Sequence, residues 1–217
     1  MNRVQIKICG VTNLADAKAC VDLGTDMIGL NFYSGSPRYI EPDRAGEIVE
    51  ALPRSVRVVG VFVDPTADEV RAIAKAAGIE CVQLHGDLSP EICRGLAREF
   101  RVIRAFSTDA KLHPEDVGAF PDCDLLLDAP HADLRGGTGL TCDWPTARAA
   151  LPFARFLILS GGLNAENVDR AIATVAPHAV DVCSGVERAP GLKDRRAIEK
   201  FIAAARTAEN SIVNPPG

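Results

Sequence analysis

The sequence lacks the features of membrane proteins, nucleic-acid-binding proteins and disulfide-stabilised proteins. No apolar run is long enough to cross a bilayer, and the first residues alternate around Arg3 and Lys7 instead of forming an apolar leader. There is no long basic run, and the formal net charge is -5, so neither nucleic acid nor an anionic membrane is an expected partner. The missing leader and the missing bilayer-spanning run predict a cytoplasmic protein. The seven cysteines stand singly without a CxxC pair, which predicts reduced thiols.

Nucleotide-binding motifs and interdomain linkers are also missing. The chain has no GxxxxGK[ST] motif and no GxGxxG after its first expected strand, so nucleotide binding has no support. No Gly/Pro/Ser-rich linker and no block of charge divides the 217 residues, of which 47% are hydrophobic and 24% charged. We therefore expect one domain over residues 1–217, because a chain of this length can bury about 70% of its unfolded surface in one core.

Short β-rich runs alternate with helical patterns along the whole chain. We expect strands over residues 5–10, 26–32, 57–63, 80–84, 101–106, 124–128, 156–160 and 179–183. The expected helices cover residues 13–23, 42–52, 64–77, 89–100, 143 onward, 164–175 and 194–207, with only a weak helical segment between residues 107 and 121. Eight such units in a chain of this length favour an α/β fold, a single (β/α)8 TIM barrel, over an open sheet.

The first strand, which ends at Cys9, suggests where the site lies. Successive side chains of a strand point to opposite faces, so Lys7 and Cys9 share the face that looks into a barrel. The same parity in later strands brings His85, Asp128 and Cys183 to the carboxyl-terminal rim, where barrel active sites are built. Alone, each has a simple structural explanation, such as a space-filling thiol or a helix cap. Together, they predict a site.

Three glycine-rich turns follow consecutive strands on the same rim. They are Gly136–Gly139 after the sixth strand, Gly161–Gly162 after the seventh and Ser184–Gly185 after the eighth. Glycine lets the backbone approach an anion closely, and helix N-termini present free N–H groups to it. Loops after the seventh and eighth strands of barrels often hold phosphate. The pattern therefore predicts a phosphate-binding site.

Eight sequence blocks in one order carry a family resemblance over nearly the whole chain. They are residues 7–10 (KICG), 36–39 (SPRY), 59–63 (VGVFV), 83–86 (QLHG), 126–128 (LLD), 136–139 (GGTG), 161–164 (GGLN) and 181–187 (DVCSGVE). The chain resembles the phosphoribosylanthranilate isomerases, barrel enzymes of tryptophan biosynthesis. It departs from the usual pattern at Cys183, where serine is common, and at Cys142, where an aromatic residue is common.

The resemblance implies residue roles. It makes Cys9 the general base and Asp128 the general acid, and it assigns Arg38 to the carboxylate of the anthranilate ring. Arg38 follows the second expected strand, and we expect it across the barrel from the phosphate turns. Residues that would contact the phosphorylated substrate are Lys7, Arg38, His85, Gly137, Gly139, Gly161, Gly162, Asp181, Ser184 and Gly185.

The implied reaction is the Amadori rearrangement of N-(5-phosphoribosyl)anthranilate, which needs no metal and no organic cofactor. An acid protonates the furanose oxygen, and a base removes the C2 proton. Because a free cysteine has a pKa of about 8.5 and a free aspartic acid one of about 3.9, opposed shifts toward neutrality are expected. Lys7 on the same face favours the Cys9 thiolate, and partial burial favours protonated Asp128.

Two alternatives remain from the residues alone. Lys7 projects into the barrel, as the Schiff-base lysine of an aldolase does, and the barrel could instead bind a sugar phosphate without turning it over. The pairing of Cys9 with Asp128 at matched strand ends argues against the non-catalytic binder. The sequence leaves monomer and homodimer equally open.

Overall fold

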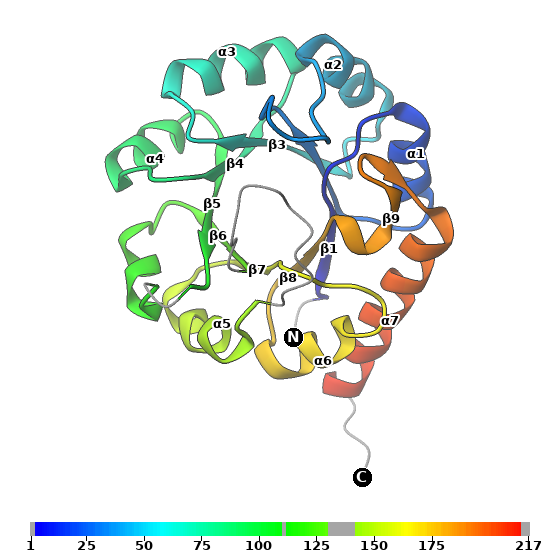
Figure 1. Ribbon diagram of the computed structural model, residues 1–217. Helices are drawn as coiled ribbons and strands as arrows, with labels where there is room; N and C mark the ends of the chain where they lie inside the picture. The colour runs from blue at the N-terminus through cyan, green and yellow to red at the C-terminus, as the bar shows by residue number, and fades with distance from the viewer. Residues whose placement is uncertain (1–2, 110–111, 130–141, 214–217) are drawn as a thin grey trace.

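The computed structural model describes residues 3–109, 112–129 and 142–213, and these residues build a closed barrel. Eight parallel strands follow one another around it in chain order, and β1 closes the ring by pairing with β8. Figure 1 looks into the barrel and shows the helices as an outer ring around the strands. The predicted (β/α)8 fold is confirmed.

The elements follow the predicted order. The barrel strands are β1 (Gln5–Ile8), β2 (Met27–Asn31), β3 (Arg57–Val63), β4 (Cys81–His85), β5 (Arg101–Ser107), β6 (Asp124–Asp128), β7 (Leu157–Leu159) and β8 (Ala179–Val182). The α-helices are α1 (Leu14–Asp22), α2 (Pro42–Ala51), α3 (Ala67–Ala77), α4 (Pro90–Leu96), α5 (Trp144–Ala150), α6 (Val168–Val175) and α7 (Arg195–Val213). Short 3-10 turns lie at η1 (Pro114–Ala119), η2 (Leu151–Phe153) and η3 (Ser184–Val186). No helix within the described ranges has both the length and the apolar character needed to cross a membrane.

Local chemistry explains where the helices begin and end. Helix α3 starts with a capping box, in which the Thr66 hydroxyl accepts from the Glu69 N–H and the Glu69 carboxylate accepts from the Thr66 N–H. It ends at Gly78, which adopts the left-handed conformation with a φ of 67°. Helix α6 starts at Val168, four residues later than predicted, because the Asn167 side chain bonds the backbone of residues 162 and 164 and holds turns there.

Two apolar layers confirm the predicted strand parity. One side of the strands packs against the helices, where residues such as Ile6, Ile8, Val82 and Leu84 are fully buried. The other side fills the lower barrel interior with a separate cluster of Met27, Val59, Cys81, Ile103, Ala105, Leu126, Ile158 and Ala179. The upper interior holds polar side chains from the carboxyl ends of the strands. The barrel fold therefore places these side chains at the rim.

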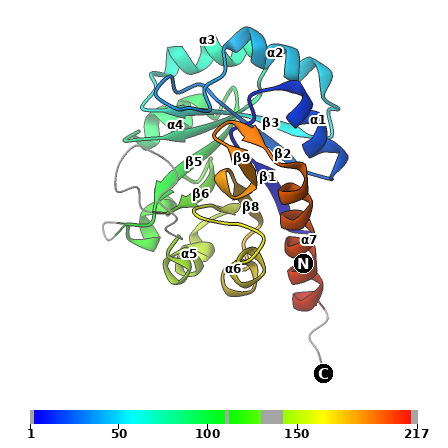
Figure 2. The same cartoon turned by 45° about the vertical axis from the view of Figure 1, so that its right-hand side comes forward.

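The chain also contains a hairpin that the sequence patterns did not predict. Strands β9 (Glu187–Ala189) and β10 (Leu192–Lys193) pair antiparallel between β8 and α7. The hairpin, drawn in orange beside β1 in Figure 2, is fixed to the start of α1 by the Lys193 N–H, which donates to Asp16 Oδ2 at 2.9 Å. It brings Glu187 and Lys193 to the rim.

Candidate active site

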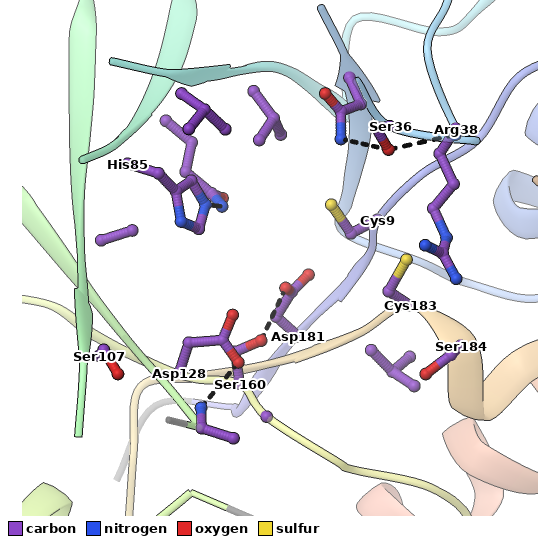
Figure 3. Close-up of a pocket in the computed structure, with 18 of the residues that line it drawn as sticks. Cys9, Ser36, Arg38, His85, Ser107, Asp128, Ser160, Asp181, Cys183 and Ser184 are labelled. Atoms are coloured by element: carbon purple, nitrogen blue, oxygen red, sulfur yellow. Dashed lines mark hydrogen bonds between the residues drawn. The ribbon is translucent and has the colours of Figure 1, made fainter. Parts of the chain in front are cut away.

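A cavity of about 730 Å³ opens at the carboxyl-terminal ends of the strands. Five of the rim residues singled out from the sequence line it, namely Cys9, Arg38, His85, Asp128 and Cys183. Figure 3 shows that they come from different parts of the rim, with Arg38 on a loop at the edge of the cavity beside Cys183. A volume of this size suits a small-molecule substrate.

Cys9 follows β1, and its backbone N–H donates to the Val182 carbonyl of β8 at 2.9 Å. Below it, Lys7 is fully buried, and its Nζ donates to Asp181 Oδ1 at 2.9 Å. The Ser160 hydroxyl donates to the other oxygen of that carboxylate at 3.1 Å. Asp181 and Ser160 line the cavity, whereas Lys7 does not. The lysine predicted as a substrate contact is instead a charge beneath the cavity floor.

The charges around Cys9 favour its thiolate. Burial by itself would lower the pKa of Lys7, but Asp181 and the Cys9 sulfur outweigh burial and raise that pKa above its ordinary value. A hydrogen bond from Cys183 is the largest influence on Cys9 and, together with Lys7 and against the effect of burial, lowers the pKa of Cys9 to about 7. This is the direction predicted for a general base.

The same pairing argues against a Schiff-base aldolase. A Schiff base forms from a neutral amine, so such a lysine needs a lowered pKa. The raised pKa of Lys7 keeps it an ammonium ion bound to Asp181. Lys7 is therefore built for electrostatic support, not for nucleophilic attack.

Asp128 ends β6 on another part of the rim, and one of its oxygens, Oδ1, accepts from the Ala129 backbone N–H at 2.8 Å. Figure 3 shows the carboxylate directed into the cavity that Cys9 also faces. The predicted rise in the pKa of Asp128 stays a prediction. The arrangement gives the cavity two titratable side chains on different parts of the rim, Cys9 after β1 and Asp128 at the end of β6.

His85 ends β4 and lines the cavity as predicted. Its Nε2 lies 2.6 Å from Nε2 of Gln83, which is buried on the same face of the strand. When the Gln83 amide donates this hydrogen bond, Nε2 of the imidazole is the acceptor and the ring is held in one orientation. Gln83 is the first residue of the QLHG block (residues 83–86), but the sequence alone assigns it no role.

Arg38 lies on the rim, but its predicted position is wrong. Its Nε and Nη2 bind the two oxygens of Glu187, with Nε–Oε1 at 3.0 Å and Nη2–Oε2 at 2.7 Å. A Cβ placed on Gly10 would lie 2.6 Å from Arg38 Cδ and 2.9 Å from Cys183 Sγ, so the arginine stands beside β8 and its turn. The unpredicted hairpin supplies Glu187, which holds Arg38 on this side of the barrel.

The glycine turns after β7 and β8 line the cavity, and their glycines are sterically required. Gly161 has a φ of 86°, and a Cβ there would lie 2.3 Å from the Ala129 nitrogen. A Cβ on Gly185 would lie 2.2 Å from the Leu163 carbonyl oxygen. Gly162 and Ser184 complete the lining of these two turns. Gly137 and Gly139 of the third predicted turn lie outside the described residues.

Sequence reasoning missed Glu187 and Lys193, which are almost fully buried at the rim and form an ion pair at 2.8 Å. Glu187 closes the DVCSGVE block, and this was the available signal. Lys193 follows Pro190 and Gly191 in a segment that reads as a solvent-exposed turn. Within the described ranges, no three His, Cys, Asp or Glu side chains are placed to hold a metal ion.

Comparison with known proteins identifies a family for this chain. The sequence model of N-(5'phosphoribosyl)anthranilate (PRA) isomerase matches residues 6–204. The N-(5'-phosphoribosyl)anthranilate isomerase of Geobacter sp. (strain M21) is 46% identical over 205 residues, which cover 93% of this chain and 98% of the relative.

Solved structures agree. The crystal structure of phosphoribosyl anthranilate isomerase from Thermotoga maritima is similar with a TM-score of 0.88 at 42% identity, covering 94% of this chain and 99% of that one. A phosphoribosyl anthranilate isomerase in complex with reduced 1-(o-carboxyphenylamino)-1-deoxyribulose 5-phosphate is similar with a TM-score of 0.85 at 40% identity, again covering 94% and 99%.

Proposed function

The chain belongs to the N-(5'-phosphoribosyl)anthranilate isomerase family, and from this premise we propose that Cys9 is its general base and Asp128 its general acid. Its activity is the aldose-ketose (Amadori) rearrangement of N-(5-phosphoribosyl)anthranilate to 1-(o-carboxyphenylamino)-1-deoxyribulose 5-phosphate in tryptophan biosynthesis. The observation that supports the two assignments is that both side chains line one cavity from the ends of β1 and β6.

Asp128 begins the reaction. As the acid, it gives a proton to the furanose ring oxygen, the bond from C1 to that oxygen breaks, and the anthranilate nitrogen becomes part of a cationic Schiff base. The resulting carboxylate of Asp128 keeps the hydrogen bond from the Ala129 N–H. Ring opening therefore depends on a proton held on the β6 side of the cavity.

Cys9 completes it. The thiolate removes the C2 proton, and the electron pair of the broken C–H bond neutralises the Schiff base to form an enolamine. The enolamine then tautomerises to the ketone. Lys7 is buried beneath Cys9 and is paired with Asp181. Its ammonium therefore stabilises the Cys9 thiolate before the proton is transferred, and it does not itself contact the substrate.

The glycine turns after β7 and β8 are proposed to hold the substrate phosphate, through backbone N–H groups near Gly161, Gly162, Ser184 and Gly185. Gly137 and Gly139 belong to this proposal from the sequence. Inorganic phosphate should then compete with the substrate. We expect millimolar phosphate to raise the apparent KM and leave kcat unchanged in steady-state assays. Phosphate that lowers only kcat would contradict the assignment.

Arg38 is proposed to bind the anthranilate carboxylate with the part of its guanidinium that Glu187 leaves available, while Glu187 fixes its orientation. Hydrogen bonds to charged groups contribute about 1.5 to 3 kcal/mol, so Arg38→Ala should lower kcat/KM by roughly 10- to 150-fold, largely through KM.

The control for Arg38 is a substrate analogue that lacks the carboxylate. It should be a poorer substrate for the wild type and nearly indifferent to Arg38→Ala. Equal losses for both substrates would show that the arginine serves only to hold Glu187 and the hairpin. Arg44→Ala, an exposed arginine on α2 paired with Glu47, is the matched surface variant and should change neither value.

The activity itself is tested with purified protein. The fluorescence of N-(5-phosphoribosyl)anthranilate should disappear at a rate proportional to enzyme concentration, with the ketose phosphate as product by mass spectrometry. Binding without turnover would instead support a non-catalytic sugar-phosphate binder. Borohydride trapping with a sugar phosphate should leave Lys7 unmodified, whereas a stable adduct would support the aldolase.

The remaining assignments extend the proposal. We propose that residues 1–217 are one domain, that the protein works in the cytoplasm on a small phosphorylated substrate, and that it binds no nucleic acid. His85 and Asp181 are proposed to contact the substrate, since both line the cavity. The protein is proposed to act as a monomer or a homodimer, which size-exclusion chromatography with light scattering distinguishes.

A further inference from the structure

We propose that Lys193 is a positioning residue for substrate specificity: it balances the charge of Glu187, so that Arg38 keeps a positive charge for the carboxylate of the substrate. The inference rests on the proposed contact between Arg38 and the anthranilate carboxylate. Neither Glu187 nor Lys193 lines the cavity, so both act on the substrate through Arg38. The hairpin of β9 and β10, which carries both residues, thereby gains a function.

The ion pair between Arg38 and Glu187 would by itself leave little charge for a ligand. Glu187 Oε2 accepts from Arg38 Nη2 at 2.7 Å, and Oε1 accepts from Arg38 Nε at 3.0 Å. The Arg38 side chain is 11% exposed and that of Glu187 only 4%, so water and salt screen this pair little. Together the two groups are neutral, and Glu187 would repel a second carboxylate that approached the guanidinium.

Lys193 adds a second cation to the same carboxylate. Its Nζ donates to Glu187 Oε1 at 2.8 Å and to the Cys183 carbonyl oxygen at 3.2 Å. The Lys193 side chain is 1% exposed, and a buried ammonium ion is costly unless it is paired. One carboxylate therefore binds two cations, and the group of Arg38, Glu187 and Lys193 has an excess of positive charge.

Glu187 is ionised in this group. Burial alone would raise the pKa of its carboxyl, but hydrogen bonds from Arg38 and Lys193 outweigh burial and hold that pKa below its ordinary value. The Gly191 N–H also donates to Oε1, at 3.2 Å. The count of two cations and one carboxylate therefore holds at neutral pH.

The excess charge reaches the cavity through Arg38. An arginine has five N–H donors, and Glu187 binds only those of Nε and Nη2. Among the residues that the structure describes, none accepts a hydrogen bond from Nη1. Arg38 lines the cavity beside Cys183 (Figure 3). A substrate carboxylate bound there would complete the balance, with two cations and two carboxylates.

The hairpin is packed against the loop that carries Arg38. The Thr12 hydroxyl donates to the Gly191 carbonyl oxygen at 2.6 Å. A Cβ on Gly191 would lie 3.3 Å from the Pro37 carbonyl oxygen, so hairpin and loop are in close contact. This packing holds Lys193 at a fixed position relative to Arg38.

Other charges near the cavity do not account for the same effect. Lys7 is paired with Asp181 at 2.9 Å. Lys193 Nζ also lies 3.9 Å from the Cys183 sulfur, so its removal changes the electrostatic field at the thiols of the site. That change acts on every substrate alike. Comparing the substrate with the analogue that lacks the carboxylate therefore isolates the effect on carboxylate binding.

The test measures Lys193→Met and wild type with the substrate and with this analogue. Methionine keeps the length of the side chain without its charge, and Glu187 stays paired with Arg38, so the barrel should fold by circular dichroism. KM for the substrate should rise roughly tenfold relative to KM for the analogue, and any change in kcat should be the same for both. Lys193→Gln, which keeps an N–H donor for the Cys183 carbonyl, should behave as Lys193→Met.

A second substitution separates charge from packing. Lys193→Met combined with Glu187→Gln removes one positive and one negative charge, so Arg38 again supplies the excess positive charge. This double variant should regain the preference for the carboxylate to within about threefold of wild type, although it disturbs more of the packing. Lys75→Met, at an exposed lysine of α3, changes the net charge equally and should leave both KM values unchanged.

Equal KM changes for substrate and analogue in folded Lys193→Met or Lys193→Gln overturn the proposal. A double variant that prefers the carboxylate no more than Lys193→Met does overturns it as well. Arg38→Ala, measured in the same series, shows which proposal fails. If only Arg38→Ala loses the preference, the contact of Arg38 stands and the role of Lys193 fails. If Arg38→Ala retains the preference, the contact and this inference fail together.

Discussion

Cys9→Ser is expected to lower kcat by roughly 100- to 10,000-fold without unfolding the barrel, because it replaces the base and removes almost no volume. The serine hydroxyl does not ionise near neutral pH, even beside the Lys7 ammonium. The variant therefore has no anion that could replace the thiolate as the base. Cys9 is buried at the end of β1 and is held by the backbone bond to Val182, which serine retains. Steady-state kinetics and circular dichroism measure the two effects.

The pH dependence of the wild type belongs to the same prediction. With the pKa of Cys9 lowered to about 7, the thiolate is lost as the pH falls below 7, so kcat/KM should decrease about tenfold per pH unit on the acid side. Above pH 8, ionisation of Cys9 is nearly complete, so it should cause no further change in kcat/KM. Cys93→Ser, at a buried thiol of α4, is the matched variant and should keep the wild-type rate. Activity in Cys9→Ser above about a tenth of wild type would remove Cys9 from the proton transfer.

Asp128→Asn is expected to cost a similar factor, roughly 100- to 10,000-fold, by removing the proton that opens the ring. Asparagine has nearly the same shape, and its Oδ1 can still accept from the Ala129 N–H, which now meets Oδ1 of Asp128 at 2.8 Å. The melting temperature should therefore change little. The loss should appear in kcat and in kcat/KM, since the interaction is made during the chemical step.

Asp143→Asn is the control for Asp128. Asp143 caps α5 by accepting from the Thr146 N–H and does not line the cavity. Asparagine caps helices as well as aspartate does, so both stability and activity should be retained. If Asp128→Asn is as active as Asp143→Asn, the acid must be sought among the other groups of the cavity.

The barrel and most of its rim are predictable because they depend on local patterns. Alternation within each strand is a property of consecutive residues, and it correctly put Cys9, His85 and Asp128 on the inward face. The glycine turns at 161 and 185 are also local, since the missing Cβ is what lets neighbouring backbone approach.

The environment of Arg38 and Cys183 could not be predicted in the same way. It depends on Glu187, which meets Arg38 across 149 positions of sequence, and on the hairpin strands β9 and β10, which have three and two residues. Such short strands carry no usable alternation. The burial of Lys193 and the displacement of Arg38 toward β8 follow from tertiary packing, which overrides the turn-like local sequence.

The separate roles of Cys9 and Asp128 are tested most directly by the deuterium isotope effect with substrate labelled at C2. In Cys9→Ser, removal of the C2 hydrogen becomes the slow step, and the residual turnover should show a large primary effect. In Asp128→Asn, ring opening becomes slow and the effect should approach unity. The reverse pattern, with the large effect in Asp128→Asn and none in Cys9→Ser, would contradict the assignment of base and acid.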